Sequence, residues 1–146
     1  MKKLVIGFVV ILLSVSHTAK GFATDISISE AEENLICRFI TAAVGEEAPL
    51  VCKTAVADVI LNRLADGSFP DSITGVIFDE DAFECVSSGE INKGFSPAAI
   101  ESARHGLDIA LLGKDPTGGA VRFAPKDSQD ALSTITFEAG RFIFGY

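Results

Sequence analysis

The sequence is poor in basic residues. Its 146 residues include 12 lysines and arginines against 20 aspartates and glutamates, so its formal net charge is -8. Nucleic acids and anionic membrane surfaces are held mainly by Lys and Arg side chains that neutralise phosphate. The shortage of basic residues therefore argues against nucleic acid and anionic membrane as partners.

Histidine is scarce as well, with two in the whole sequence. A nucleophilic cysteine needs a neighbouring base, most often His, to form the reactive thiolate. His105 is the only histidine beyond the N-terminal apolar segment that contains His17. The sequence therefore gives little support to Cys–His catalysis.

No apolar run reaches the roughly 20 residues that a membrane-spanning helix needs. The N-terminal run from Leu4 to Val15 follows two lysines and precedes the small residues Gly21 and Ala23. This pattern is typical of a secretory signal peptide, with an uncleaved anchor as the alternative. We predict a signal peptide over residues 1–23, no stable membrane span after its removal, and an exported protein, periplasmic or extracellular. Removal would change the net charge from -8 to -11 by deleting Lys2, Lys3 and Lys20.

The three cysteines are an odd number, so they cannot all pair within one chain. Disulfides form and persist in exported proteins. Cys37 and Cys52 lie on either side of the loop between the first two predicted helices, so we predict a disulfide between them. Cys85 lies in an apolar run and is interpreted as a small buried hydrophobic residue.

Apolar periodicity predicts a helical body followed by strands. Ser29 and Glu32 form a capping-box pattern before a helix over residues 30–44, which Gly45 ends. Pro49 and Ser96-Pro97 open two further helices, and an apolar element of uncertain type lies near residues 73–78. The acidic run over residues 79–81 is interpreted as a solvated face or a helix start rather than a calcium site. Strand-like runs follow at residues 120–123, 135–137 and 141–144.

These elements predict one small α+β domain. Its helical body carries a small antiparallel β-sheet at the C-terminal end. Residues 24–34 are predicted as an N-terminal lead-in and residues 35–146 as the domain itself. The residues after position 23 are enough for one compact core and too few for two.

Three segments occur in a fixed order, namely residues 57–63 (ADVILNR), 82–92 (AFECVSSGEIN) and 115–120 (DPTGGA). Each is unspecific alone, but together they resemble the SleB-type cell wall hydrolases, the spore-cortex-lytic family of peptidoglycan-cleaving enzymes. The resemblance extends from near Leu35 to Phe144. It implies a lysozyme-like hydrolase fold.

The resemblance also implies an activity, that of an exported peptidoglycan hydrolase acting as a lytic transglycosylase. Such an enzyme cleaves the glycan strand between muramic acid and glucosamine, and needs no cofactor or metal. Glycosidic cleavage requires a carboxylic acid with a raised pKa. In lytic transglycosylases a single glutamate suffices, because the sugar's own 6-hydroxyl captures the cleaved centre. The expected partner is therefore the peptidoglycan glycan strand.

The chain departs from the family at two polar positions. The family's acidic glutamate falls on Ala42, Ala43 or Val44, and a family histidine near the last strand falls on Arg141 or Phe142. These departures raise an alternative function. The domain would then be catalytically inactive, keeping the hydrolase fold to bind the cell wall or another envelope protein.

Glu46 and Glu47 lie in the loop where the resemblance places the acid, so they are the candidate catalytic residues. Partial burial would make each raise the pKa of the other. The alternative is that both are solvated at the start of the second helix. Glu84 and Glu90, beside the central segment, are the next candidates.

The resemblance implies substrate-binding residues in the matched segments. For each, a structural role as a helix cap, core residue or tight turn is the alternative. These candidates are Asn62, Arg63, Phe83, Asp115, Thr117, Gly118 and Gly119.

Overall fold

A computed structural model describes residues 26–128 and 132–146. The predicted signal peptide, residues 1–23, lies outside these ranges. The described elements are α1 (Glu30–Val44), α2 (Leu50–Ala65), α3 (Ile73–Ile77), α4 (Glu84–Ser87), a 3₁₀ turn η1 (Glu90–Asn92), α5 (Pro97–Leu111), β1 (Arg122–Pro125), β2 (Ile135–Ala139) and β3 (Phe142–Gly145). Within the described ranges, no helix is both long and apolar enough to cross a membrane.

The helix signals of the sequence are confirmed. The Ser29 side chain accepts a hydrogen bond from the Glu32 amide, and the Glu32 carboxylate accepts one from the Ser29 amide, which completes the capping box of α1. Gly45 ends this helix at φ +91°, a conformation that glycine adopts without strain. Ser96 caps α5, and Pro49 stands immediately before α2. Helix α1 begins at Glu30, inside the segment that we predicted as a lead-in.

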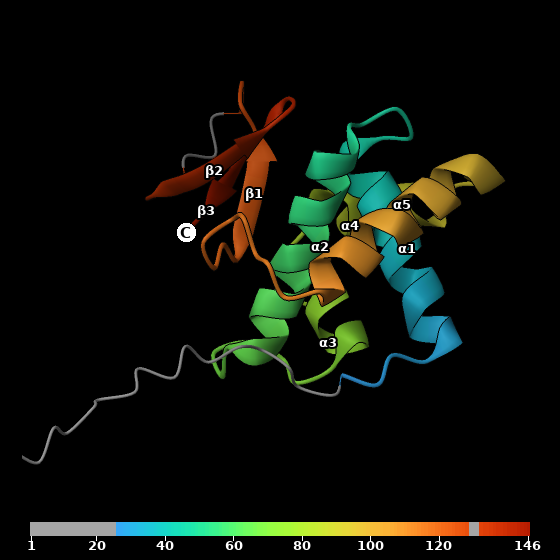
Figure 1. Ribbon diagram of the computed structural model, residues 1–146, viewed down its shortest axis with the longest axis horizontal. Helices are drawn as coiled ribbons and strands as arrows, with labels where there is room; N and C mark the ends of the chain where they lie inside the picture. Colours follow the sequence, from blue (N-terminus) through green and yellow to red (C-terminus); the bar gives the residue numbers. More distant parts are fainter. Residues whose placement is uncertain (1–25, 129–131) are drawn as a thin grey trace, which may run out of the picture.

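Helix α2 lies between the sheet and the other long helices (Figure 1). It packs most extensively against α5, and the two backbones come very close at Gly106. A Cβ atom at Gly106 would lie 3.1 Å from the backbone of Lys53 and Thr54. The absence of a side chain at this position is therefore what lets the two helices pack closely.

The three C-terminal strands form one antiparallel sheet in the order β1-β3-β2. The last two predicted strands are each confirmed within a few residues, and the first lies slightly later than the predicted residues 120–123. The turn between β2 and β3 is tight, because Ala139 still pairs with Phe142 and Gly140 takes φ +54°. Together, the helical body and this sheet confirm the predicted α+β fold class.

A cluster of phenylalanines joins the helical body to the sheet. Phe39 of α1 meets Phe83 edge-on at 4.7 Å between ring centroids, and Phe83 stacks on Phe123 of β1 at 5.8 Å. Phe123 in turn contacts Phe142 and Phe144 of β3. Aromatic pairs in these geometries bury large apolar areas. The cluster therefore fixes the position of the sheet against α1.

The predicted disulfide between Cys37 and Cys52 is wrong, since both cysteines are free and buried. Burial raises the pKa of each thiol to about 11. The Cys37 thiol lies near the charged groups of Arg104 and Glu33, whereas the Cys52 thiol donates a hydrogen bond to the Ala139 carbonyl at 3.4 Å. Cys37 lies two turns from the end of α1, whereas Cys52 lies in the first turn of α2. Because a helix rises ~1.5 Å per residue, the two cysteines lie at different heights along the two packed helices.

We expect all three cysteines to titrate as free thiols. Unfolding the purified protein without reductant should expose three groups that react with a thiol reagent, because no pair meets the geometry of a disulfide. A Cys52→Ser variant, the matched control, should expose two. Reaction of a single thiol in the unreduced wild-type chain, together with none in a Cys85→Ser variant, would restore the Cys37–Cys52 pairing.

Candidate functional site

Two large cavities open on the described part of the chain, and they share no lining residue. The first, called the aromatic cleft, holds about 610 Å³ between α1, α4 and the sheet. The second, called the aspartate pocket, holds about 650 Å³ between α2, α5 and the segment after α5. Both are large enough for one or two sugar rings or a side chain of similar size.

The aromatic cleft combines rings, cations, carboxylates and hydroxyl groups. This mixture is suited to a sugar, which presents apolar ring faces and a rim of hydroxyls. Its side chains with these properties are Phe83, Phe123, Phe142, Arg63, Arg122, Asp81, Glu84, Glu90, Ser87, Ser88 and Ser128.

Arg63 links the end of α2 to the cleft. Its guanidinium lies 4.4 Å from the Phe83 ring centre and 4.7 Å from the Phe69 ring centre, while Nε donates to the Val121 carbonyl at 2.7 Å. Burial lowers the pKa of this guanidinium. These contacts match the structural interpretation, in which Arg63 ties the helix to the strand segment. Arg63 also lies in the cleft wall, so its contact with substrate stays a prediction.

Phe83 is only 7% exposed, because Phe39 and Phe123 cover it. Its ring contributes to the wall of the cleft from within the core. Stacking on a sugar requires an exposed ring face. The structure therefore supports the core interpretation of Phe83 more than the sugar-stacking one.

Three carboxylates line the aromatic cleft. Glu90 forms an ion pair with Lys93, and Asp81 is held in a left-handed conformation at φ +56°. Glu84 stands in the first turn of α4 and is exposed. Within the described ranges, its carboxylate has no hydrogen bond or ion pair. Asp81 is exposed too, and within the described ranges its carboxylate also has no hydrogen bond or ion pair. Glu84 and Asp81 are thus the cleft carboxylates most available to a ligand.

Some of the residues onto which the resemblance places the family's acid and histidine lie in this same cleft. Ala42 and Ala43 line it from the end of α1, and Phe142 lines it from β3, whereas Val44 and Arg141 do not. Segments about 100 residues apart are thus brought to one surface. Where the family would place an acid and a histidine, this cleft presents methyl groups and an aromatic ring.

Glu46 and Glu47 are exposed and line neither cavity. The Glu46 carboxylate accepts hydrogen bonds from the Ser96 amide at 2.9 Å and the Ser96 hydroxyl at 3.2 Å, which ties it to the start of α5. Lys53 donates to the Glu46 carbonyl. The catalytic role of these two glutamates stays a prediction, and their positions give it no support.

The turn over residues 115–119 is held by its own hydrogen bonds. Asp115 accepts bonds from the Thr117 amide at 2.8 Å, the Thr117 hydroxyl at 2.6 Å and the Gly119 amide at 2.8 Å. Asn62 donates to Asp115 and to the Ala120 carbonyl, each at 2.9 Å. Tyr146 donates to the Gly118 carbonyl. Because the Thr117 and Gly119 amides are already occupied, the turn has the contacts of a structural corner rather than of a glycan-binding loop.

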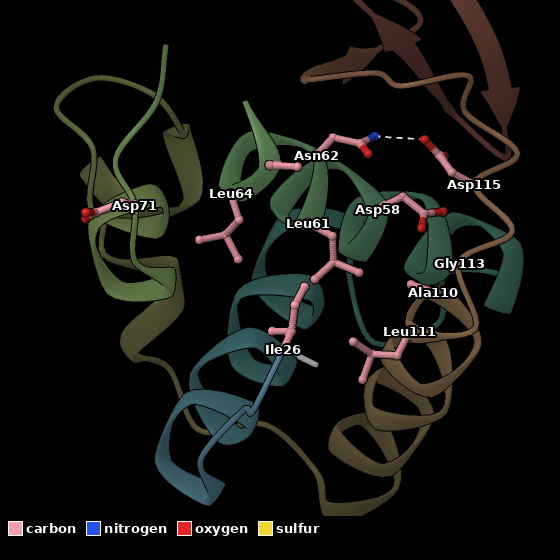
Figure 2. A pocket seen from close by; sticks show the side chains of 11 residues that line it. Ile26, Asp58, Leu61, Asn62, Leu64, Asp71, Ala110, Leu111, Gly113 and Asp115 are labelled. Carbon is pink, nitrogen blue, oxygen red and sulfur yellow. Dashed lines mark hydrogen bonds between the residues drawn. The ribbon is translucent and has the colours of Figure 1, made fainter. Parts of the chain in front are cut away.

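Asp58 is the residue that sequence reasoning missed. Figure 2 shows it on α2, with its carboxyl directed toward the segment that carries Gly113 and Asp115. It is 2% exposed, and its Oδ2 has no hydrogen-bond partner among residues 26–128 and 132–146. Burial, helped by the negative charge of Asp115, raises the pKa of Asp58 to about 7. The available signal was one carboxyl residue within the otherwise apolar run over residues 55–61.

Asp115 behaves in the opposite way. Burial alone would raise its pKa, but hydrogen bonds from Thr117, Asn62 and Gly119 outweigh that effect and lower the pKa. The two carboxyl groups of the aspartate pocket therefore differ in charge near neutral pH. Asp115 is ionised, and a large share of Asp58 is protonated.

Comparison with solved structures places the fold among spore cortex-lytic enzymes. The chain matches the catalytic domain of the Bacillus cereus SleB protein with a TM-score of 0.68 and 28% identity, over 83% of this chain and 94% of that one. It matches the catalytic domain of the germination-specific lytic transglycosylase SleB from Bacillus anthracis with a TM-score of 0.67 and 27% identity, over 83% and 98%.

Curated relatives give the same result. The chain is 44% identical to a spore cortex-lytic enzyme of Halalkalibacterium halodurans over 80 residues, which are 55% of this chain and 23% of that protein. It is 38% identical to one of Bacillus cereus over 98 residues, 66% of this chain and 36% of that protein. The chain thus spans about a third or less of the length of these relatives.

The helical body, C-terminal sheet and aromatic cleft define a domain of the SleB catalytic type, which confirms the resemblance seen in the sequence. The Cell Wall Hydrolase family model matches residues 47–144, and the chain belongs to that family.

The titration of Asp58 yields a test. The pKa of Asp58 is raised from its ordinary value of 3.8 to about 7 in the folded protein. Between these two pH values, the folded protein holds a proton on Asp58 that the unfolded chain has lost. The free energy of unfolding should therefore fall as the pH rises through this range, by on the order of 4 kcal/mol at most. Above this range it should level off. Asp58→Asn cannot titrate, so the variant should lose this fall and exceed the wild type in stability at about pH 8.

Urea unfolding at several pH values measures the effect. Asp71→Asn is the matched control, because Asp71 lines the same pocket but is exposed. It should keep the wild-type dependence. The same fall in stability in Asp58→Asn as in the wild type would show that another group is responsible.

Proposed function

We propose that this chain is an exported cell wall hydrolase that cleaves peptidoglycan glycan strands as a lytic transglycosylase. The observation that carries the proposal is the aromatic cleft, which is lined by Arg63 of the matched segment 57–63 and by several residues of the matched segment 82–92. The family supplies the substrate class, and a structural relative is described as a lytic transglycosylase. Export, with a periplasmic or extracellular location, follows from the predicted signal peptide.

The reaction needs one carboxylic acid at the glycosidic oxygen. Glu84 is the strongest candidate, because it lines the cleft, its carboxylate has no partner within the described ranges, and it lies in the matched segment over residues 82–92, which does not include Asp81. A glycan strand lying over the cleft would exclude water from this carboxyl and bring it to the glycosidic oxygen, where a general acid must act. Glu90 is weaker because Lys93 pairs with it.

In this proposal the muramic acid 6-hydroxyl attacks the anomeric carbon as the bond to the leaving sugar oxygen breaks. The proton from the acid passes to that oxygen, and the resulting carboxylate takes the proton of the 6-hydroxyl. The product carries a 1,6-anhydro end, and the acid is restored. Neither water nor a cofactor is consumed. The guanidinium groups of Arg63 and Arg122 lie in the cleft wall and would pair with carboxylates of the muramyl peptide.

A second function is favoured by Ala42, Ala43 and Phe142, which give the cleft apolar groups at the positions of the family acid and histidine. The domain would then bind glycan strands or an envelope protein without cleaving. Binding and cleavage use the same cleft, so the two functions differ only in whether soluble fragments are released.

Incubation with peptidoglycan from several sources, including cortex with muramic lactam, followed by mass spectrometry of soluble muropeptides, tests the proposal. We expect fragments with 1,6-anhydro ends. Glu84→Gln should reduce their release by about 100-fold or more, because an amide cannot donate the proton. Glu80→Gln, an exposed neighbour outside the cleft, is the control and should act as wild type.

The double variant Glu46→Gln, Glu47→Gln separates the loop acids from the cleft acid. If it abolishes release while Glu84→Gln does not, the acid is in the loop, as the sequence suggested. Hydrated reducing ends would show that water is the nucleophile. Wall binding by the folded protein with no fragments from any source would establish the non-catalytic function.

A further inference from the structure

The aspartate pocket has an acidic end and an apolar wall. Asp58 and Asp115 lie at one end, and Asp71 lies at the opening (Figure 2). No lining residue is basic. The apolar wall comes from the N-terminal segment, α2 and α5, through Ile26, Leu61, Leu64, Ala65, Ala110 and Leu111. A ligand of this pocket should therefore combine a positive, hydrogen-bond-donating group with an apolar chain.

Asp58 supplies the unused acceptor. Its Oδ2 is enclosed and has no hydrogen-bond partner within the described ranges, while the residue is 2% exposed. Buried polar atoms are nearly always paired, and leaving one unpaired destabilises the fold. A donor entering the pocket would relieve this cost, so binding would be directed to this atom.

Asp115 cannot take the same role, because Asn62, Thr117 and Gly119 already occupy its carboxylate. It contributes negative charge instead. Its charge disfavours ionised Asp58 in the empty pocket and would favour a cation placed between the two groups. From α5 and the N-terminal segment only uncharged groups line the pocket, so Asp58, Asp71 and Asp115 are its charged side chains.

We propose that the aspartate pocket binds a primary alkylammonium group, whose nitrogen donates to Asp58 Oδ2 and whose methylene chain packs against Leu61, Leu64 and Leu111. Such a group occurs on lysine-type side chains of peptides and on free aliphatic amines. A metal ion fits less well, since no set of three or more His, Cys, Asp or Glu side chains with a metal-binding arrangement occurs within the described ranges. The site goes beyond the proposed function and does not depend on it.

The geometry of α2 keeps the two sites separate. Asp58, Leu61, Asn62 and Ala65 follow one stripe of the helix and face the aspartate pocket, whereas Arg63 faces the aromatic cleft. A ligand in the pocket would therefore leave the cleft open. A substitution that abolishes ligand binding in the aspartate pocket should leave the activity of the aromatic cleft unchanged, and the reverse should also hold.

Calorimetric titration of the full folded chain near pH 7 with n-butylammonium and with Nα-acetyl-lysine N-methylamide tests the inference. We expect roughly millimolar dissociation constants, as is usual for ligands of this size. Asp58→Asn should weaken binding by about tenfold or more, because a charge-assisted hydrogen bond is lost. Asp71→Asn should bind as wild type, and tighter binding of one probe would identify a peptide or a free amine as the source.

The protonation of Asp58 provides a second readout. Binding of a cation should release a fraction of a proton near pH 7, so the measured heat should vary with the ionisation heat of the buffer. In Asp58→Asn this variation should disappear. Leu111→Trp, which would fill the pocket from a residue that is 41% exposed, should also lose binding and serves if Asp58→Asn does not fold.

Several results would overturn the inference. They are no binding of either amine, equal binding of n-butanol and n-butylammonium, or unchanged binding by Asp58→Asn. Muropeptide release should be the same in Asp58→Asn as in the wild type. A failure of the amine titration is therefore distinguishable from a failure of the cell wall hydrolase proposal.

Discussion

The hydrogen bonds that Asp115 accepts hold together the parts of this protein that make its two cavities. Asn62 brings the last turn of α2 to this carboxylate, and Thr117 and Gly119 fold the following turn around it. Arg63, the next residue on α2, then binds the Val121 carbonyl just before β1. The entry of the chain into the sheet is therefore fixed from the end of one helix.

This constraint explains why the motif residues have mainly structural contacts. Asn62 and Arg63 point to different sides of α2, one toward the aspartate pocket and one toward the aromatic cleft. Both also bond to backbone carbonyls of residues 120 and 121. A segment can thus identify a family of hydrolases because it builds the cleft, without supplying the reacting group.

The carboxyl groups of the aromatic cleft and of the aspartate pocket differ in burial. In the cleft, the Glu84 carboxylate is exposed. In the pocket, burial has already raised the pKa of Asp58 to about 7.

The sequence by itself determined the local elements and the family. The capping box at Ser29, the Ser96-Pro97 start and the apolar periods depend on near neighbours, so helix positions and the C-terminal sheet could be read directly. Contacts between distant segments could not. The predicted Cys37–Cys52 pairing was wrong, because whether two cysteines can bond depends on how α1 and α2 are offset along their axes. The carboxyl of Asp58 is enclosed by α2, α5 and the Asp115 turn, so its lack of a partner could be seen only in the tertiary structure. Burial and partnership of a charged group are properties of packing, which only the tertiary structure decides.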